Sequence, residues 1–202
     1  MQPFTKLTAV AATLDLANID TDKIIPARFL RRLRGPGYEK LAFHDIRYDA
    51  DGKDRPDFVL NQTPYRHAKI LVAGANFGCG SSREAAVYVL FDYGIRSVIA
   101  PSFGDIHYGN ELQNGMLPVI LPDATCQKLR EQLRERPGAQ ITVDLEAQTV
   151  TGPDGATYRF DLDANHKERL LKGLDDIGLV MQNIAEIEAF ETKHHSELPW
   201  LA

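Results

Sequence analysis

Residues 69–101 read KILVAGANFGCGSSREAAVYVLFDYGIRSVIAP, and their pattern establishes the fold class. The apolar run 70–73 is typical of a buried strand and stops at Gly74. A helix is predicted over 83–93, and the apolar run 97–101 predicts another buried strand. A strand, a helix and a strand in this order indicate a βαβ unit, in which the two strands are parallel.

The same alternation extends in both directions along the chain. Toward the carboxyl end we predict a helix over 103–113, a strand over 117–121 and a helix over 124–135. Toward the amino end we predict a short strand over 5–10, a loop over 18–26 and a helix over 27–33. The chain is therefore expected to be an α/β protein with a largely parallel core sheet and flanking helices.

Two further regions depart from this alternation. Residues 34–64 are rich in glycine and proline, so we expect a long surface loop with short pieces of structure; such loops are more often functional than idle. Apolar and polar residues alternate over 141–145 and again over 158–162, on either side of the turn signal 152–155. This pattern predicts a C-terminal β-hairpin. Helices over 164–172 and 184–193 follow, and we interpret the whole tail as scaffold.

Composition excludes several classes of function. A length of 202 residues suits one domain. The composition, with 44% hydrophobic and 25% charged residues, is typical of a soluble globular protein. A net charge of −5 argues against binding to nucleic acid, and no apolar run reaches the roughly 20 residues of a membrane span. The first ten residues lack the pattern of a signal peptide, so we expect a cytoplasmic protein.

The cysteines and histidines do not predict a metal site in this chain. Cys79 and Cys126 are too few for a disulfide framework, and a [4Fe–4S] cluster needs about three or four thiolates. The six histidines show no ligand spacing beyond the adjacent pair near the carboxyl end. We therefore expect no metal to be bound by this chain alone.

The turn Gly-Cys-Gly-Ser-Ser-Arg-Glu at 78–84 carries the strongest functional signal, because it lies between a predicted strand and a predicted helix. Backbone N–H groups and the positive end of the helix dipole favour an anion there. Arg83 offers a planar fork that binds carboxylates. The turn lacks the lysine of a phosphate-binding loop and the third glycine of a dinucleotide fingerprint. A plain capped helix, with Ser81 or Ser82 as the N-cap, is the alternative.

Five stretches together resemble the family of 3-isopropylmalate dehydratase small subunits. They are NIDTDKIIPARFL at 18–30, NFGCGSSRE at 76–84, VIAPSF at 98–103, NGMLP at 114–118 and GLDDIGL at 173–179. The resemblance covers residues 4–191 and implies one swivelling β/β/α domain over residues 1–202, like the fourth domain of aconitase. It also implies a partner large subunit that carries a [4Fe–4S] cluster. The implied reaction is the isomerisation of 2-isopropylmalate and 3-isopropylmalate, by dehydration and rehydration, in leucine biosynthesis.

The resemblance also implies roles for individual residues. Ser81 corresponds to the serine base of the aconitase superfamily. Ser82 and Arg83, with Gly80, are expected to bind a carboxylate of a small dicarboxylic hydroxy acid. Thr21 and Asp22 match a Thr-Asp pair that supports the site, although an Asx-type turn is the alternative.

Residues 30–38 occupy the place where related enzymes recognise the side chain of the substrate. Leu30 and Leu33 are the expected specificity residues, because an isopropyl group requires an apolar pocket. Arg34, with the neighbouring arginines, either binds a carboxylate or belongs to a solvated basic face.

The active loop departs from the family pattern. The family usually continues Arg-Glu-His-Ala-Pro-Trp, whereas this chain has Ala85 in place of the histidine and Val87 in place of the proline. A related hydro-lyase for methylmalate (citraconate) or dimethylmaleate is therefore the enzymatic alternative. A non-catalytic partner of a large subunit and a free-standing anion-binding protein are the alternatives from other classes.

Overall fold

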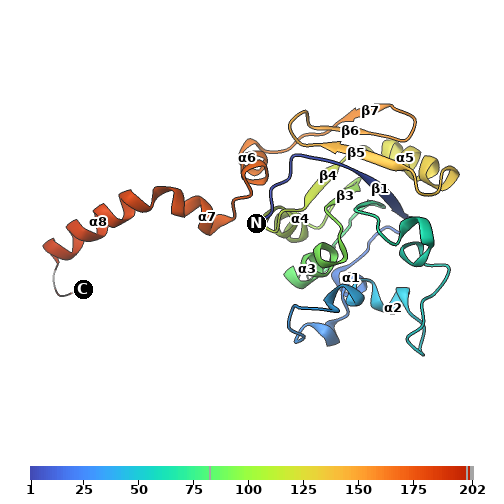
Figure 1. Ribbon diagram of the computed structural model, residues 1–202, viewed down its shortest axis with the longest axis horizontal. Helices are drawn as coiled ribbons and strands as arrows, with labels where there is room; N and C mark the ends of the chain where they lie inside the picture. The colour runs from blue at the N-terminus through green and yellow to red at the C-terminus, as the bar shows by residue number, and fades with distance from the viewer. Residues whose placement is uncertain (82, 199, 201–202) are drawn as a thin grey trace.

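The computed structural model describes residues 1–81, 83–198 and 200, and a mixed sheet forms its centre (Figure 1). Within these residues the sheet has seven strands in the order β4-β3-β2-β1-β5-β6-β7. The strands are β1 (Lys6–Leu14), β2 (Ile70–Ala73), β3 (Ser97–Ala100), β4 (Leu117–Ile120), β5 (Gln140–Asp144), β6 (Thr149–Thr151) and β7 (Thr157–Arg159). The predicted α/β fold class is confirmed.

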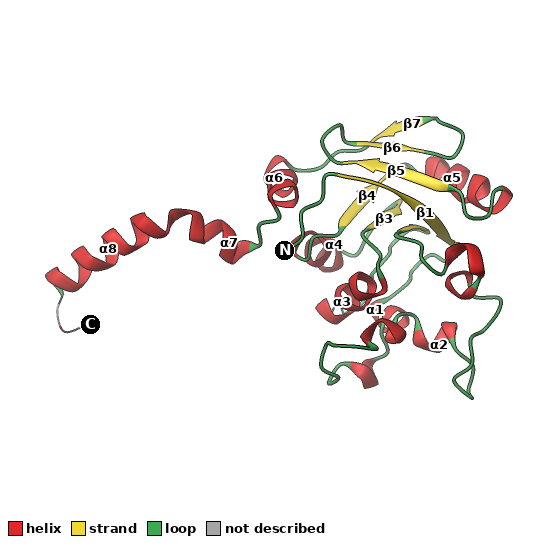
Figure 2. Ribbon diagram, in the orientation of Figure 1, coloured by secondary structure: helices red, strands yellow, loops and turns green. Residues whose placement is uncertain are grey.

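The parallel half of the sheet, β4-β3-β2-β1, forms as predicted, and helices cover both of its faces (Figure 2). These helices are α3 (Glu84–Tyr93), α4 (Asp105–Gln113) and α5 (Asp123–Glu135). Leu71 and Ala73 of β2 join one core cluster with α3, whereas Ile70 and Val72 join a second cluster with α5. Alternate residues point to opposite faces, so a strand buried on both sides is apolar throughout.

The antiparallel half corrects the predicted hairpin. Residues 141–145 do not pair with 158–162; β5 pairs with β6, and β6 pairs with β7. The intervening strand Thr149–Thr151 is only three residues long and lies between two turns, so its alternation is too short to recognise from the sequence. β5 also pairs antiparallel with β1 and thereby joins the two halves. Helix α6 (Ala164–Lys172) follows as predicted.

The amino-terminal segment differs from its prediction in two places. Helix α1 (Thr21–Ile24) lies in the stretch predicted as loop, with the side chain of Asp20 as its cap. The helix predicted over 27–33 is only a 3-10 turn, η1 (Ala27–Phe29). None of the residues 27–33 is buried, and a short helix without an apolar face against a core has little to stabilise it.

The segment 34–64 is more than a surface loop. It contains η2 (Tyr38–Leu41), α2 (His44–Arg47), η3 (Val59–Asn61) and η4 (Thr63–Tyr65). Tyr38, Leu41, Phe43 and Leu60 are buried in the core cluster that includes α3. The predicted short pieces of structure are confirmed, but the segment packs as a layer against the body.

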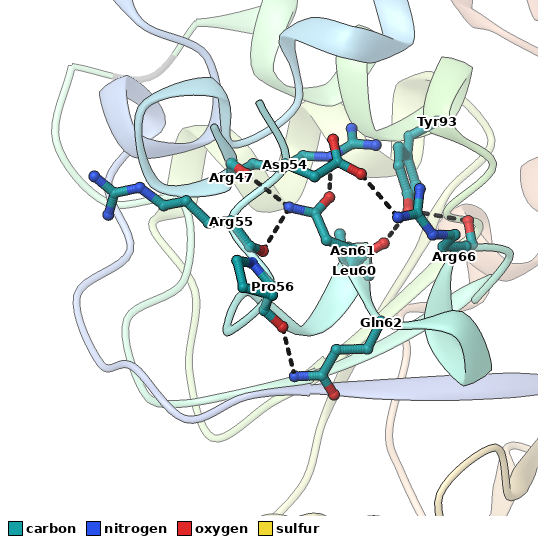
Figure 3. A network of polar contacts seen from close by, with 9 residues as sticks. All are labelled: Arg47, Asp54, Arg55, Pro56, Leu60, Asn61, Gln62, Arg66 and Tyr93. Atoms are coloured by element: carbon teal, nitrogen blue, oxygen red, sulfur yellow. Dashed lines mark hydrogen bonds and ion pairs between the residues drawn. The ribbon is translucent and has the colours of Figure 1, made fainter. Parts of the chain in front are cut away.

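Polar contacts fix the second half of this layer (Figure 3). The side-chain amide of Asn61 donates to the carbonyl oxygens of Arg47 at 2.7 Å and Arg55 at 2.9 Å. The hydroxyl of Tyr93, at the end of α3, donates to the carbonyl oxygens of Leu60 at 3.2 Å and Arg66 at 3.0 Å. The layer is therefore attached to the same helix that begins at the glycine–serine turn.

The carboxyl end forms an arm that projects from the body (Figure 1). It consists of α7 (Asp176–Val180), the 3-10 turn η5 (Met181–Asn183) and α8 (Ile184–Glu197). The helix predicted over 184–193 is confirmed and continues to Glu197. Among the helices described, none is long and apolar enough to cross a membrane.

Candidate functional site

The glycine–serine turn links the end of β2 to the start of α3. Gly78 and Gly80 have φ values of +71° and +86°, in the left-handed region that favours glycine. The N–H of Gly78 donates to the carbonyl of Ile19 at 2.7 Å, and the N–H of Thr21 donates to the carbonyl of Cys79 at 3.2 Å. Two stretches about 60 positions apart in the sequence therefore lie side by side, and both were singled out by the family resemblance.

Side chains strengthen this junction. Thr21 is buried, and its hydroxyl donates to the carbonyl of Ser81 at 3.1 Å. Arg83 donates through Nη1 to Oδ1 of Asp22 at 2.6 Å. The structure thus brings together five of the predicted site residues, which are Thr21, Asp22, Gly80, Ser81 and Arg83. The sixth, Ser82, lies outside the described residues.

The turn opens to solvent. Gly80 and Ser81 are exposed, the Arg83 side chain keeps 28% of its accessible surface, and that of Asp22 keeps 55%. The guanidinium is therefore within reach of a ligand, and the hydroxyl of Ser81 lies at the surface. At this exposure the Arg83–Asp22 pair adds little to stability, so a competing carboxylate would have a small cost to overcome.

The capped-helix alternative does not account for Ser81. Arg83, not Ser81, is the N-cap residue of α3, and its side chain makes no capping hydrogen bond. The positive end of the ten-residue helix α3 lies next to Arg83. The partial positive charge of the helix end and the guanidinium of Arg83 lie side by side, and together they favour the binding of an anion.

A buried pair of polar side chains supports the turn from below. Nε2 of His107 lies 3.0 Å from Oε1 of Glu111, and neither side chain has accessible surface. A Cβ added at Gly78 would lie 2.2 Å from the His107 ring, so only glycine fits between turn and ring. Burial raises the pKa of the Glu111 carboxyl, and the neighbouring His107 ring opposes this shift. Sequence reasoning missed the pair, although its i,i+4 spacing on a predicted helix was visible.

Helix α4 also holds the far end of the turn. Asn114, which follows α4, donates from its side-chain amide to Oε1 of Glu84 at 3.0 Å. Glu84 directly follows Arg83 and begins α3. The turn is thus held at Gly78 by packing on His107 and at Glu84 by a hydrogen bond from Asn114.

The predicted specificity segment lies beside α3. Leu33 is 89% exposed and Leu30 is 37% exposed, so both are available to a ligand or partner. Arg34 instead forms a fork with Asp92 of α3, with Nε and Nη2 at 2.8 Å and 2.6 Å from the two carboxylate oxygens. Its guanidinium also lies 4.8 Å from the centre of the Tyr88 ring. The bond to Asp92 raises the pKa of Arg34, and this arginine anchors the segment to the helix.

The donor set of this chain does not fit an iron–sulfur cluster. Cys79 is partly exposed in the turn, whereas Cys126 is fully buried on α5. Burial raises the pKa of the Cys126 thiol to about 11, which disfavours the thiolate that binds iron. No group of three histidine, cysteine or acidic residues within the described part of the chain could hold a metal ion.

Comparison with known proteins agrees with this geometry. The family model of the aconitase C-terminal domain matches residues 1–124, which include the whole turn and its neighbouring segment. The LeuD_N model matches residues 127–164. The model of the carboxyl-terminal domain of 3-isopropylmalate dehydratase small subunits matches residues 176–202.

Similar proteins extend over the full length of the chain. The 3-isopropylmalate dehydratase small subunits of Dinoroseobacter shibae and Parvibaculum lavamentivorans are each 52% identical over 201 residues, with 100% of both chains covered. The crystal structure of 3-isopropylmalate dehydratase from Methanocaldococcus jannaschii has the same fold, with a TM-score of 0.65 and 24% identity over 91% of this chain and 99% of that one. The chain therefore belongs to the family of 3-isopropylmalate dehydratase small subunits, within the aconitase superfamily.

Proposed function

We propose that this chain is the small subunit of a cytoplasmic heteromeric hydro-lyase that interconverts 2-isopropylmalate and 3-isopropylmalate in leucine biosynthesis. The observation that carries the proposal is the exposed turn, in which Ser81 lies two positions before Arg83 and Arg83 pairs with the carboxylate of Asp22. The relatives are named small subunits, a name that implies a large subunit. All of residues 1–202 would act as one domain on that partner.

In this proposal Ser81 is the general base. The proton to be removed lies beside a carboxylate and is weakly acidic, so the reaction requires a positioned base. A serine hydroxyl serves only if its alkoxide is stabilised, and the positive end of α3 and the Arg83 guanidinium supply positive charge beside it. Thr21 fixes the backbone at Ser81 through its 3.1 Å hydrogen bond, which positions the base.

Arg83 would bind a carboxylate of the substrate, with Ser82 and the backbone at Gly80 as further donors. Asp22 pairs with the guanidinium, which stays partly exposed. A carboxylate with two oxygens matches the planar fork better than the single contact to Asp22. Asp22 would therefore release the fork when the substrate binds.

Two thiols in unlike environments do not hold a [4Fe–4S] cluster, so the cluster is assigned to the large subunit. Bound there, it supplies a Lewis acid for the departure of hydroxide, which is a poor leaving group. The chain described here provides the base and the carboxylate clamp. Leu30 and Leu33 would contact the isopropyl group, and Arg34 would hold their segment against α3.

The test of this function is reconstitution with the cognate large subunit under anaerobic conditions. The pair should convert 3-isopropylmalate to 2-isopropylmalate and back, with lower kcat/KM for methylmalate and dimethylmalate. A preference of the pair for methylmalate would assign the chain to the citraconate-type hydro-lyase.

The chain alone should be colourless and inactive. Purified anaerobically with iron and sulfide, it should show no visible absorbance of a cluster and no turnover of isopropylmalate, because its two thiols are too few for a cluster. The reconstituted pair is the positive control. A brown, active preparation of the chain alone would contradict the division of labour between the subunits.

Arg83→Lys should raise the KM for isopropylmalate by roughly tenfold to one hundredfold. An ammonium is a point charge and replaces a planar fork poorly; a hydrogen bond to a charged group contributes about 1.5–3 kcal/mol. Arg66→Lys is a matched control, since Arg66 pairs with Asp54 away from the turn. Initial rates across a range of substrate concentrations measure the effect. Equal KM values for the two variants would show that Arg83 does not bind the carboxylate of the substrate.

A further inference from the structure

The carboxyl-terminal arm, residues 174–198, has an uncovered apolar face. The side chains at 177, 180, 181 and 184 recur at the spacing of one helical face, and Phe190 lies on another side of the arm. Their exposed fractions are Ile177 75%, Val180 55%, Met181 52%, Ile184 38% and Phe190 66%. Contiguous apolar surface of this kind marks an interaction site in a soluble protein.

The arm obtains little support from the body. None of the α7 or α8 residues is buried. Among the described residues, the side-chain hydrogen bonds and ion pairs between α7 and the body run from Asp176 to Arg169 and to Gln113. An isolated helix of about 12–15 residues is marginal in water, and α8 has 14 residues. Another surface is therefore needed to keep the arm helical.

The charge of the arm indicates what that surface is. The arm contains six acidic residues and one lysine, 1 − 6 = −5, which equals the net charge of the whole chain. The rest of the chain is balanced, with 28 − 6 = 22 acidic and 23 − 1 = 22 basic residues. Two arms packed against each other would bring charges of −5 together, which disfavours a second copy of this chain. An apolar groove with a basic rim is the complementary surface.

We propose that the arm docks its apolar face into such a groove on the large subunit and tethers the two subunits. The identity of this partner rests on the proposed function. No residue of the candidate site belongs to the arm, which projects away from the body, so it contributes affinity without contributing to the chemistry (Figure 1). An amphipathic helix in a groove is a common mode of protein recognition.

The test uses the full-length chain with Val180→Ser and Ile184→Ser combined, because both side chains lie on this face. Ile120→Ser is the control, since Ile120 is 47% exposed at the end of β4 and lies outside the arm. Purified large subunit is titrated into each variant, and both binding heat and isopropylmalate turnover are followed. We expect the concentration of the partner at half-saturation to rise about tenfold or more, with kcat at saturation unchanged. The control should match the wild type.

A second variant tests the charge. Glu186→Lys with Glu188→Lys and Glu191→Lys keeps the apolar side chains and reverses three of the six acidic residues of the arm. Binding of the large subunit should weaken, and its dependence on salt concentration should flatten.

Three results would overturn the proposal. Unchanged half-saturation of the apolar variant would show that the arm does not tether the partner. Sedimentation of the wild type as a dimer that the apolar variant dissociates would assign the face to a second copy. If binding of the charge variant depended on salt concentration as the wild type does, the inferred basic rim of the groove would be wrong. If the wild-type pair binds but does not turn over isopropylmalate, the proposed reaction fails, while the heats of binding still decide the role of the arm.

Discussion

Ser81→Ala should lower kcat of the reconstituted enzyme by about 10²–10⁴-fold, the usual contribution of a positioned general base. The loss should fall on kcat rather than on KM, because Arg83 and its neighbours would still bind the carboxylates. Stability should change by less than about 0.5 kcal/mol, since Ser81 is exposed. Steady-state kinetics on both isopropylmalates, with thermal melts of the chain alone, measure the two effects.

Thr157→Ala is the matched control for this experiment. Thr157 is an exposed hydroxyl on β7, in the antiparallel half of the sheet. Its removal should leave kcat and KM unchanged. If Ser81→Ala retained wild-type turnover, the chain would be a non-catalytic partner, and the base would have to belong to the large subunit.

His107→Ala should destabilise the chain by roughly 3–5 kcal/mol. The substitution leaves a cavity beneath Gly78 and strips Glu111 of its partner in a fully buried site, and breaking a buried pair has about this cost. His67→Ala is the control, because His67 is exposed and its loss should change the free energy of unfolding by less than about 0.5 kcal/mol. Urea denaturation of both variants measures the difference. Similar midpoints would show that the pair does not stabilise the fold.

The pH dependence of stability offers an independent measurement on the same pair. Burial raises the pKa of Glu111 above its unfolded value of about 4.3, so the folded chain holds this proton more tightly. The contribution of Glu111 is full below the unfolded pKa and is lost as the pH rises through the folded pKa. Glu111→Gln cannot lose a proton, so its stability should fall less over that range. Parallel stability profiles for the wild type and this variant would contradict the raised pKa.

The parallel core was predictable because its physical signal is local. Each of the runs 70–73 and 97–100 is fully buried, and such strands must be apolar at nearly every position. Gly94 ends α3 in a left-handed conformation, as expected for a glycine that follows a helix. The elements that were missed or misplaced are short: α1, the strand β6, the 3-10 turn at 27–29 and α7. Tertiary packing, rather than local pattern, determines segments of three to five residues.

The candidate site was predictable in its members but not in its contacts. The family resemblance selected both Asp22 and Arg83, yet only the fold places side chains 61 positions apart in an ion pair. Arg34 was expected to face either a substrate or solvent, and the structure binds it to Asp92. His107 and Glu111 are polar residue types that usually lie at the surface, so nothing in their composition predicted complete burial.

The position of β1 has a mechanical consequence. This nine-residue strand pairs with β5 through Lys6–Val10 and with β2 through Ala11–Leu14, so the two halves of the sheet meet end to end along one continuous strand. A rotation of one half against the other would have to bend β1 between Val10 and Ala11. In the proposed two-chain enzyme, a swivel that moves the whole chain as a rigid body would leave both ladders intact.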